Sequence, residues 1–121
     1  MRKKTVLIID DETEFADMVQ MRLEANNFEV ITAPNGADGY ELAQTAKPNL
    51  ILLDVMMPVM DGFETLRKLR RSVVTQATPI IMLTARGESA SIFKAQGLNV
   101  TDYLTKPFDS TELVATVKRY A

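Results

Sequence analysis

Residues 49–58 of the chain read NLILLDVMMP, and they place one aspartate, Asp54, between two apolar segments. The apolar run Leu50–Leu53 comes directly before Asp54, and the apolar residues 55–57 come directly after it. A carboxylate next to an apolar core costs several kcal/mol unless it is paired, bound to a metal or protonated. The rest of the chain must therefore supply partners for Asp54.

The composition limits which partners these can be. The chain has 121 residues, 46% of them hydrophobic, which predicts one domain with a substantial core over residues 1–121. It has no cysteine and no histidine, so a disulfide framework, a zinc–thiolate site and a histidine base are excluded. The net charge is −2, and Lys and Arg are scattered, which argues against direct binding of nucleic acid.

The hydropathy pattern argues against a membrane location. Every apolar run is far shorter than the roughly 20 residues that cross a bilayer. The first residues, MRKK, lead into only the short run Val6–Ile9 before two aspartates, so neither a signal peptide nor an anchor is indicated. We therefore expect a soluble cytoplasmic protein without a membrane partner.

Short apolar runs predict the strands. Three of them are bounded by polar or proline residues and are too short for helices, so they indicate strands covered on both faces: Val6–Ile9, Leu50–Leu53 and Ile80–Leu83. Two further segments, Phe28–Thr32 and Asp102–Thr105, mix polar and apolar residues. This mixture is typical of strands at the edges of a sheet.

Helical periods alternate with these strands. The inward positions are predicted to be Phe15, Met18, Val19 and Leu23, then Leu42, Ala43 and Ala46 within Asn35–Ala46, then Phe63, Leu66, Leu69 and Val73, and finally Leu113, Val117 and Tyr120. A further helix, the fourth of five along the chain, is expected at Glu88–Gly97, where the pattern is weakest. Three helices should open with capping boxes, formed by Asp11 with Glu14, Asp61 with Glu64, and Asp109 with Glu112.

The order of strand and helix, repeated five times, predicts an α/β fold. The fold would be a doubly wound, five-stranded parallel sheet with five helices on its two faces. With the apolar strands in the centre, the flavodoxin-like strand order 2-1-3-4-5 fits best. Ligands bind such sheets beyond the carboxyl ends of the strands where the order reverses, here between the first and third strands.

Polar residues follow the strands at that edge. The strand ends carry Asp10 and Asp11, then Asp54, then Thr84, and finally Lys106 with Pro107. Carboxylate oxygens without nitrogen or sulfur donors suit Mg²⁺, and a lysine and a hydroxyl nearby would hold a phosphoryl group. An aspartate beside such a metal is a candidate nucleophile that forms an aspartyl phosphate. Asp54 is the best candidate, because Asp11 has a competing role as a helix cap.

Each of these residues also has an ordinary explanation. Aspartates at strand ends are mostly caps or turn formers, threonines there are mostly β-formers, and a lysine before a proline is mostly a solvated loop residue. Four strand ends that carry complementary groups for phosphoryl transfer nevertheless favour a functional site.

Along its whole length the chain resembles the CheY-like receiver domain of bacterial two-component response regulators. The segments that carry the resemblance are VLIIDDE, LILLDVMMPVMDGFE, PIIMLTA and DYLTKPF, in the family's order. The resemblance implies a signalling switch rather than an enzyme, with catalysis limited to its own phosphorylation and slow dephosphorylation. Asp54 would take the phosphoryl group from a histidine kinase, a histidine phosphotransfer protein or a small phosphodonor.

The resemblance also implies the ligands of Mg²⁺, with Mn²⁺ as the alternative ion. Asp11 would bind the metal directly and Asp10 largely through water. Asp54 and the backbone carbonyl of Met56 would complete the protein ligands.

Further residues are implied to read the phosphoryl group. Lys106 would contact it, and the Lys106–Pro107 bond would be cis. Thr84 and Tyr103 resemble the switch pair: the Thr84 hydroxyl and the Ala85 backbone N–H would approach the phosphoryl oxygens, and Tyr103 would fill the space that Thr84 leaves. The surface of the fourth helix, fifth strand and fifth helix would then change for a partner.

Two more positions are implied to set the lifetime of the phosphoryl group. In the family, residues two after the phosphoacceptor and two after the switch hydroxyl tune hydrolysis, and here they are Met56 and Arg86. A methionine cannot hold an attacking water through a hydrogen bond. The sequence therefore predicts a phosphoryl group that persists longer than in relatives with a polar residue at this place.

Three other functions fit part of the pattern. A phosphatase of the haloacid dehalogenase type would need a second aspartate where Met56 stands, and a cap domain. A flavodoxin-like cofactor binder would need a Ser-, Thr- or Gly-rich phosphate loop after the first strand, where residues 10–12 are all acidic. A non-phosphorylated interaction module of the same fold is the remaining alternative, and the intact set of acids, threonine and lysine argues against it.

The sequence contains no pattern that identifies what the switch controls downstream. The chain is either a stand-alone regulator of an effector protein or a receiver cut from a longer protein with a C-terminal output domain. A phosphorylation-linked homodimer is compatible with both.

Overall fold

The computed structural model describes residues 2–55, 57, 61–85, 97 and 99–121 of the chain. The elements along these residues are β1 (Thr5–Ile9), α1 (Thr13–Glu24), β2 (Glu29–Ala33), α2 (Gly36–Ala46), β3 (Leu50–Asp54), α3 (Gly62–Arg71), β4 (Ile80–Ala85), β5 (Asp102–Lys106) and α5 (Ser110–Tyr120). The predicted helix at Glu88–Gly97 lies, apart from Gly97, outside the described residues.

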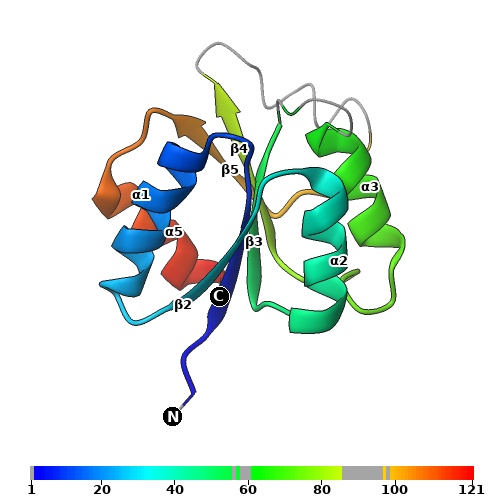
Figure 1. Ribbon diagram of the computed structural model, residues 1–121, viewed down its shortest axis with the longest axis horizontal. Coiled ribbons are helices and arrows are strands. Elements are labelled where there is room, and N and C mark those ends of the chain that lie inside the picture. Colours follow the sequence, from blue (N-terminus) through cyan, green and yellow to red (C-terminus); the bar gives the residue numbers. More distant parts are fainter. Residues whose placement is uncertain (1, 56, 58–60, 86–96, 98) are drawn as a thin grey trace.

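The five strands form one parallel sheet in the order β2-β1-β3-β4-β5, which confirms the predicted topology. Helices α1 and α5 cover one face of the sheet, and α2 and α3 cover the other (Figure 1). Leu52 in the central strand is in register with Ile8 of β1 and Ile81 of β4. All five strands run the same way, so their carboxyl ends lie along one edge of the sheet.

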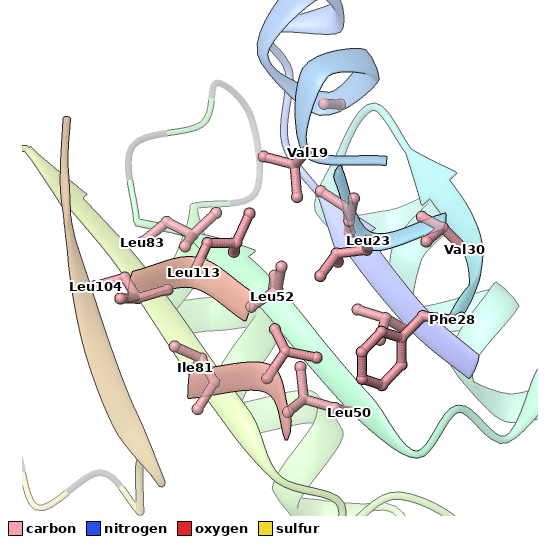
Figure 2. Packing of buried hydrophobic residues seen from close by; sticks show 14 residues of the cluster. Val19, Leu23, Phe28, Val30, Leu50, Leu52, Ile81, Leu83, Leu104 and Leu113 are labelled. Carbon is pink, nitrogen blue, oxygen red and sulfur yellow. The ribbon is translucent and has the colours of Figure 1, made fainter. Parts of the chain in front are cut away.

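The core is divided into two clusters by the sheet, because successive side chains of a strand point to opposite faces. Leu50 and Leu52 of β3 belong to the cluster beneath α1 and α5, which Figure 2 shows from close by. Ile51 and Leu53 belong to the cluster beneath α2 and α3. Every residue of β3 is buried, which explains its unbroken apolar run. The edge strands β2 and β5 keep exposed positions, as their mixed composition predicts.

Two of the three predicted helix caps are confirmed. Asp61 accepts the Glu64 N–H at 2.9 Å, and Asp109 accepts the Glu112 N–H at 2.7 Å. The predicted cap at Asp11 is wrong, because the N-cap residue of α1 is Glu12, whose side chain makes no capping bond.

The neighbouring Asp10 explains this difference. Its Oδ1 atom accepts the backbone N–H of Glu12 at 2.9 Å, so the turn into α1 is closed by Asp10 rather than by Asp11.

Three predicted inward positions are also wrong. Met18 is 47% exposed because Ala16 takes the inward place on α1, and Val73 is 84% exposed because α3 ends before it, at Arg71. Ala46 is exposed as the last residue of α2. Propensity and periodicity locate a helix more reliably than they locate its last turn.

The described helices are short; α1 has 12 residues and α3 has 10. Within the described ranges, we find no helix with the length and apolarity that crossing a membrane requires.

Candidate functional site

Four charged residues meet at the carboxyl edge of the sheet: Asp10 after β1, Glu12 at the N-cap of α1, Asp54 at the end of β3 and Lys106 at the end of β5. The Lys106 Nζ atom lies 3.0 Å from Asp10 Oδ2, 3.2 Å from Glu12 Oε1 and 3.8 Å from Asp54 Oδ1. Lys106 is the last residue of β5, and Asp54 is the last residue of β3. The predicted convergence of Asp10, Asp54 and Lys106 on one edge is therefore present in the structure.

The two aspartates of this arrangement are buried. The side chain of Asp10 is 0% exposed and that of Asp54 is 7% exposed. Both oxygens of Asp10 are engaged, Oδ1 by the Glu12 N–H at 2.9 Å and Oδ2 by Lys106. Buried carboxylates of this kind are costly unless a cation and hydrogen bonds satisfy them. Lys106 supplies that cation here.

Three carboxylates are close enough together to bind one metal ion. Among the residues that the structure describes, Asp10, Glu12 and Asp54 offer oxygen atoms that all lie within 4.8 Å of one another. Hard oxygen donors without nitrogen or sulfur match the preference of Mg²⁺. The donor set therefore fits the predicted cofactor.

Glu12 is the residue that the sequence reasoning missed. In the sequence it stands out only as part of the acidic run 10–12, whereas the predicted metal ligand Asp11 is exposed and does not belong to the described carboxylate group. Glu12 is 64% exposed and reaches back from the start of α1 to Lys106. The signal that would have found it is the third consecutive acid, which begins the helix.

Electrostatics keeps Lys106 charged. Burial alone would lower the pKa of Lys106, but the hydrogen bond to Asp10, the negative charge of Asp54 and the contact with Glu12 outweigh it. The pKa of Lys106 is therefore raised above its ordinary value of 10.5. At neutral pH the side chain is an ammonium ion that faces three carboxylates.

The ammonium group of Lys106 lies beside an aromatic pair. The ammonium lies 4.1 Å from the centre of the Phe15 ring, a cation–π arrangement. Phe15 packs edge to face against Phe108, with 5.7 Å between the ring centres. The helical pattern of α1 predicts an inward Phe15 but not its contact with a residue so far along the chain.

The predicted switch residues lie on the other face of the sheet. Thr84 is 3% exposed, and its hydroxyl lies 3.4 Å from that of Thr105, its partner in β5. Tyr103 is half-buried and packs against the cluster beneath α2 and α3. By strand alternation, Thr84 points to that same face, and Asp54 points to the face of α1 and α5.

Burial raises the pKa of the Tyr103 hydroxyl, and the negative charge of Asp102 adds to the effect. Tyr103 is therefore a neutral phenol at physiological pH.

The remaining predicted site residues divide into two groups. The Lys106–Pro107 peptide bond is cis, as the resemblance implies, and Ala85 is the last residue of β4. Met56 and Arg86 lie outside the described residues.

Comparison with known proteins finds a family that matches nearly the whole chain. A family model described as response regulator receiver domain matches residues 6–118. The phosphate regulon transcriptional regulatory protein PhoB of Pseudomonas aeruginosa is 45% identical over 117 residues, which is 95% of this chain and 50% of PhoB. The alkaline phosphatase synthesis transcriptional regulatory protein PhoP of Bacillus subtilis is 41% identical over 115 residues, 95% of this chain and 47% of PhoP. The chain thus spans about half the length of these curated relatives.

Solved structures are similar over nearly the whole chain. The chemotaxis protein CheY4 of Vibrio cholerae superposes with a TM-score of 0.90 at 34% identity, covering 98% of this chain and 99% of that one. The receiver domain of the sensor histidine kinase PA1611 from Pseudomonas aeruginosa gives a TM-score of 0.88 at 25% identity, covering 98% and 97%. That structure has a magnesium ion coordinated in its active-site cleft.

Proposed function

The chain belongs to the response regulator receiver domain family of two-component systems, and from this premise we propose that Asp54 is its phosphoacceptor. A receiver domain is a signalling domain rather than a metabolic enzyme. The observation that carries the proposal is the carboxylate group of Asp10, Glu12 and Asp54, with the charged Lys106 beside it.

The proposed reaction transfers a phosphoryl group to the Asp54 carboxylate. A carboxylate oxygen attacks phosphorus, a new P–O bond forms, and the bond to the donor breaks. The electron pair of that bond leaves with the imidazole of a phosphohistidine or with the acetate of acetyl phosphate. A bound Mg²⁺ would neutralise charge on the transferred oxygens.

Lys106 would have one role before phosphoryl transfer and another after it. Before transfer it balances the charge of Asp10 and Glu12, at 3.0 and 3.2 Å. Afterwards its ammonium would turn to a phosphoryl oxygen, a stronger acceptor because of the added charge. Asp10, once Lys106 turns away from it, would remain available to a bound metal ion through water.

The proposed metal ligands are Asp54, Asp10 through water, the exposed carboxylate of Asp11 and the backbone carbonyl of Met56. Asp10 and Asp54 are buried at the sheet edge, which supports their part in this set. Glu12 belongs to the described carboxylate group and Asp11 does not, but the Glu12 carboxylate is already engaged by Lys106. Mn²⁺ has the same preference for oxygen ligands and would replace Mg²⁺.

In the proposed switch, phosphorylation of Asp54 changes the conformation of a surface that a partner can bind. The Thr84 hydroxyl and the Ala85 backbone N–H would move to the phosphoryl oxygens, and Tyr103 would fill the vacated space. Such a shift is usually worth about 1–3 kcal/mol, so some active conformer would exist without phosphorylation. The responding surface would include β5, α5 and the predicted helix at Glu88–Gly97.

Two residues would set how long the signal lasts. Met56 and Arg86, which both lie outside the described residues, flank the proposed phosphoacceptor and the switch hydroxyl in sequence. Met56 offers no hydrogen bond to an attacking water, so we expect slow hydrolysis of the aspartyl phosphate.

The proposed partners are a histidine kinase or a histidine phosphotransfer protein upstream, in the cytoplasm. Downstream, the relatives PhoB and PhoP are named transcriptional regulators and are about twice as long as this chain. This length supports an output domain in a longer protein, although a separate effector protein fits the same site. A homodimer formed on phosphorylation is compatible with either form.

Intact-mass analysis after incubation with acetyl phosphate and Mg²⁺ tests the proposal. The wild type should gain one phosphoryl group and Asp54→Ala should gain none. Asp17→Ala is the matched control, because Asp17 is an exposed acid on α1, and it should be labelled like the wild type. Equal labelling of Asp54→Ala would show that the phosphoacceptor is another residue.

A further inference from the structure

We propose that Gly62 is a positioning residue that fixes the backbone of Asp54 and thereby the place of its carboxylate. The first turn of α3 packs on the end of β3 so closely that only a residue without a Cβ atom fits. The inference rests on the proposed role of Asp54 as phosphoacceptor and adds a residue that does not itself touch the reacting atoms.

The contact is made with backbone atoms. Gly62 is buried and is the first residue of α3. A Cβ atom built on it would collide with the backbone oxygen of Asp54 and lie 2.7 Å from Val55 Cα and 3.1 Å from the Asp54 carbonyl carbon. The Gly62 N–H also donates to the Val55 carbonyl oxygen at 3.0 Å. Backbone atoms of a strand, unlike the end of a side chain, cannot turn aside to make room.

The helix side of this contact is firmly held. Asp61 accepts the Glu64 N–H through its side chain and the Thr65 N–H through its carbonyl, at 2.9 and 3.1 Å. Leu66 and Leu69 anchor the same helix in the core beneath α2 and α3, each 0% exposed. Helix α3 therefore cannot retreat from β3 without giving up core packing.

The strand side is held as well. Asp54 is in register with Leu83 of β4, and the Val55 N–H donates to the Leu83 carbonyl oxygen at 3.1 Å. The end of β3 thus lies between a paired strand and a packed helix. A methyl group added at Gly62 would have to displace this strand end, and the Asp54 carboxylate would move with it.

Gly39 provides a matched control. A Cβ atom on Gly39 would lie 2.5 Å from Cδ1 and 2.6 Å from Cγ1 of Ile9, so it is equally crowded. The crowding atoms belong to the side chain of Ile9 in β1 rather than to a strand backbone. Gly39→Ala therefore makes the same chemical change at a buried position of a helix without touching the strand end that carries Asp54.

The expected effect is on the rate of phosphorylation rather than on labelling as such. A misplacement of about 1 Å at a reacting group can cost about 10²-fold in rate. We expect Gly62→Ala to be phosphorylated by acetyl phosphate at least about tenfold more slowly than the wild type at saturating Mg²⁺. Gly39→Ala should stay within about twofold of the wild type.

The experiment follows the labelling rate by intact mass and the folded state by circular dichroism for the wild type and both variants. A folded Gly62→Ala that labels at the wild-type rate overturns the inference. So does a Gly39→Ala that slows as much as Gly62→Ala, because general loosening would then explain both. Failure of the proposed function would look different, because Asp54→Ala would then be labelled like the wild type.

A second measurement decides the question if Gly62→Ala does not fold. Amide hydrogen exchange in the wild type compares the Gly62 N–H with the N–H of Ser110, the corresponding first residue of α5. First-turn amides of a helix have no partner within the helix and exchange readily. A held contact predicts at least about tenfold slower exchange for Gly62 than for Ser110, and equal exchange overturns the inference.

Discussion

The ammonium group of Lys106 donates a hydrogen bond of 3.0 Å to Asp10, although β3 and β4 separate their two strands in the sheet. A side chain rather than a backbone ladder therefore joins the end of β5 to the residue that follows β1, and its ammonium lies 3.8 Å from Asp54 Oδ1. A phosphoryl group on Asp54 would compete with Asp10 for this ammonium.

Mg²⁺ should stabilise the folded chain. An ion that binds only the folded state adds about 2.7 kcal/mol at a concentration of 100 times its Kd. We expect a rise in the unfolding midpoint with added Mg²⁺ for the wild type and for the control Asp17→Asn. Asp10→Asn and Asp54→Asn should show little of this rise, and an undiminished rise in both would contradict the proposed ligands.

Asp11 and Glu12 should differ in their contribution to metal binding. Asp11→Asn should weaken Mg²⁺ binding by at least about tenfold, because it removes a proposed direct ligand. Glu12→Gln removes an ion pair whose carboxylate is 64% exposed, and it should change the affinity only a few-fold. Titration of the unfolding midpoint with Mg²⁺ measures both affinities, and the reverse order would make Glu12 the ligand.

The stabilisation by Lys106 should depend on pH in a defined direction. The pKa of Lys106 is raised above 10.5 in the folded chain, so the charged form is favoured by folding. Its contribution is fully present below the unfolded pKa and is lost as the pH rises through the folded pKa. The difference in unfolding free energy between the wild type and Lys106→Met should therefore be flat from about pH 7 to 10 and shrink above that.

Urea denaturation at several pH values measures that difference, and Lys118→Met is the control, because Lys118 is an exposed residue of α5. A difference that already disappears between pH 7 and about 9 would contradict the raised pKa.

Arg70 should be a main stabilising residue of the region where α3 ends and where β4 and β5 begin. Its guanidinium donates to the carbonyl oxygens of Asn99 at 2.8 Å and Thr78 at 2.7 Å, and so joins the end of α3 to the segments before β4 and β5. Lysine cannot reproduce this fork, so Arg70→Lys should cost about 1.5–3 kcal/mol of unfolding free energy. The exposed neighbour Arg71→Lys should cost less than about 0.5 kcal/mol in the same urea experiment.

The hydroxyl of Thr84 should be needed for the switch rather than for labelling. Thr84→Val keeps the buried shape but removes the hydroxyl, so Asp54 should still be phosphorylated. The ring signals of Tyr103 in an NMR spectrum should then stay as in the unphosphorylated chain, whereas they should shift in the wild type. A full shift of Tyr103 in Thr84→Val would refute the proposed coupling.

The strands could be predicted because apolar runs are a local signal, and their order and the place of the site follow from the rules of parallel-sheet topology. Unbroken apolar runs mark strands buried on both faces, and the strand ends of a parallel sheet must meet at one edge. Asp10, Asp54 and Lys106 are each the first polar residue after such a run or the last residue of an edge strand. Their convergence follows from topology alone.

Other features could not be predicted because they depend on contacts between distant residues. The choice between Asp11 and Glu12 at the start of α1 is decided by Asp10, which takes the Glu12 N–H. The cation–π contact of Phe15 with Lys106 needs the position of β5 relative to α1. Periodicity also placed Val73 on the inward face of α3, because an apolar residue at helical spacing fits the pattern whether or not the helix has already ended.

The division of β3 between two cores restricts how a domain of this kind can change its length. Leu52 faces α1 and α5 while Leu53 faces α2 and α3, so which face receives the Asp54 carboxylate depends on whether an even or an odd number of residues precedes it in the strand. Loops on either side can gain or lose single residues without moving the carboxylate across the sheet. A single-residue insertion or deletion inside β3 would turn it away from Lys106, so tolerated changes in this strand should come in pairs.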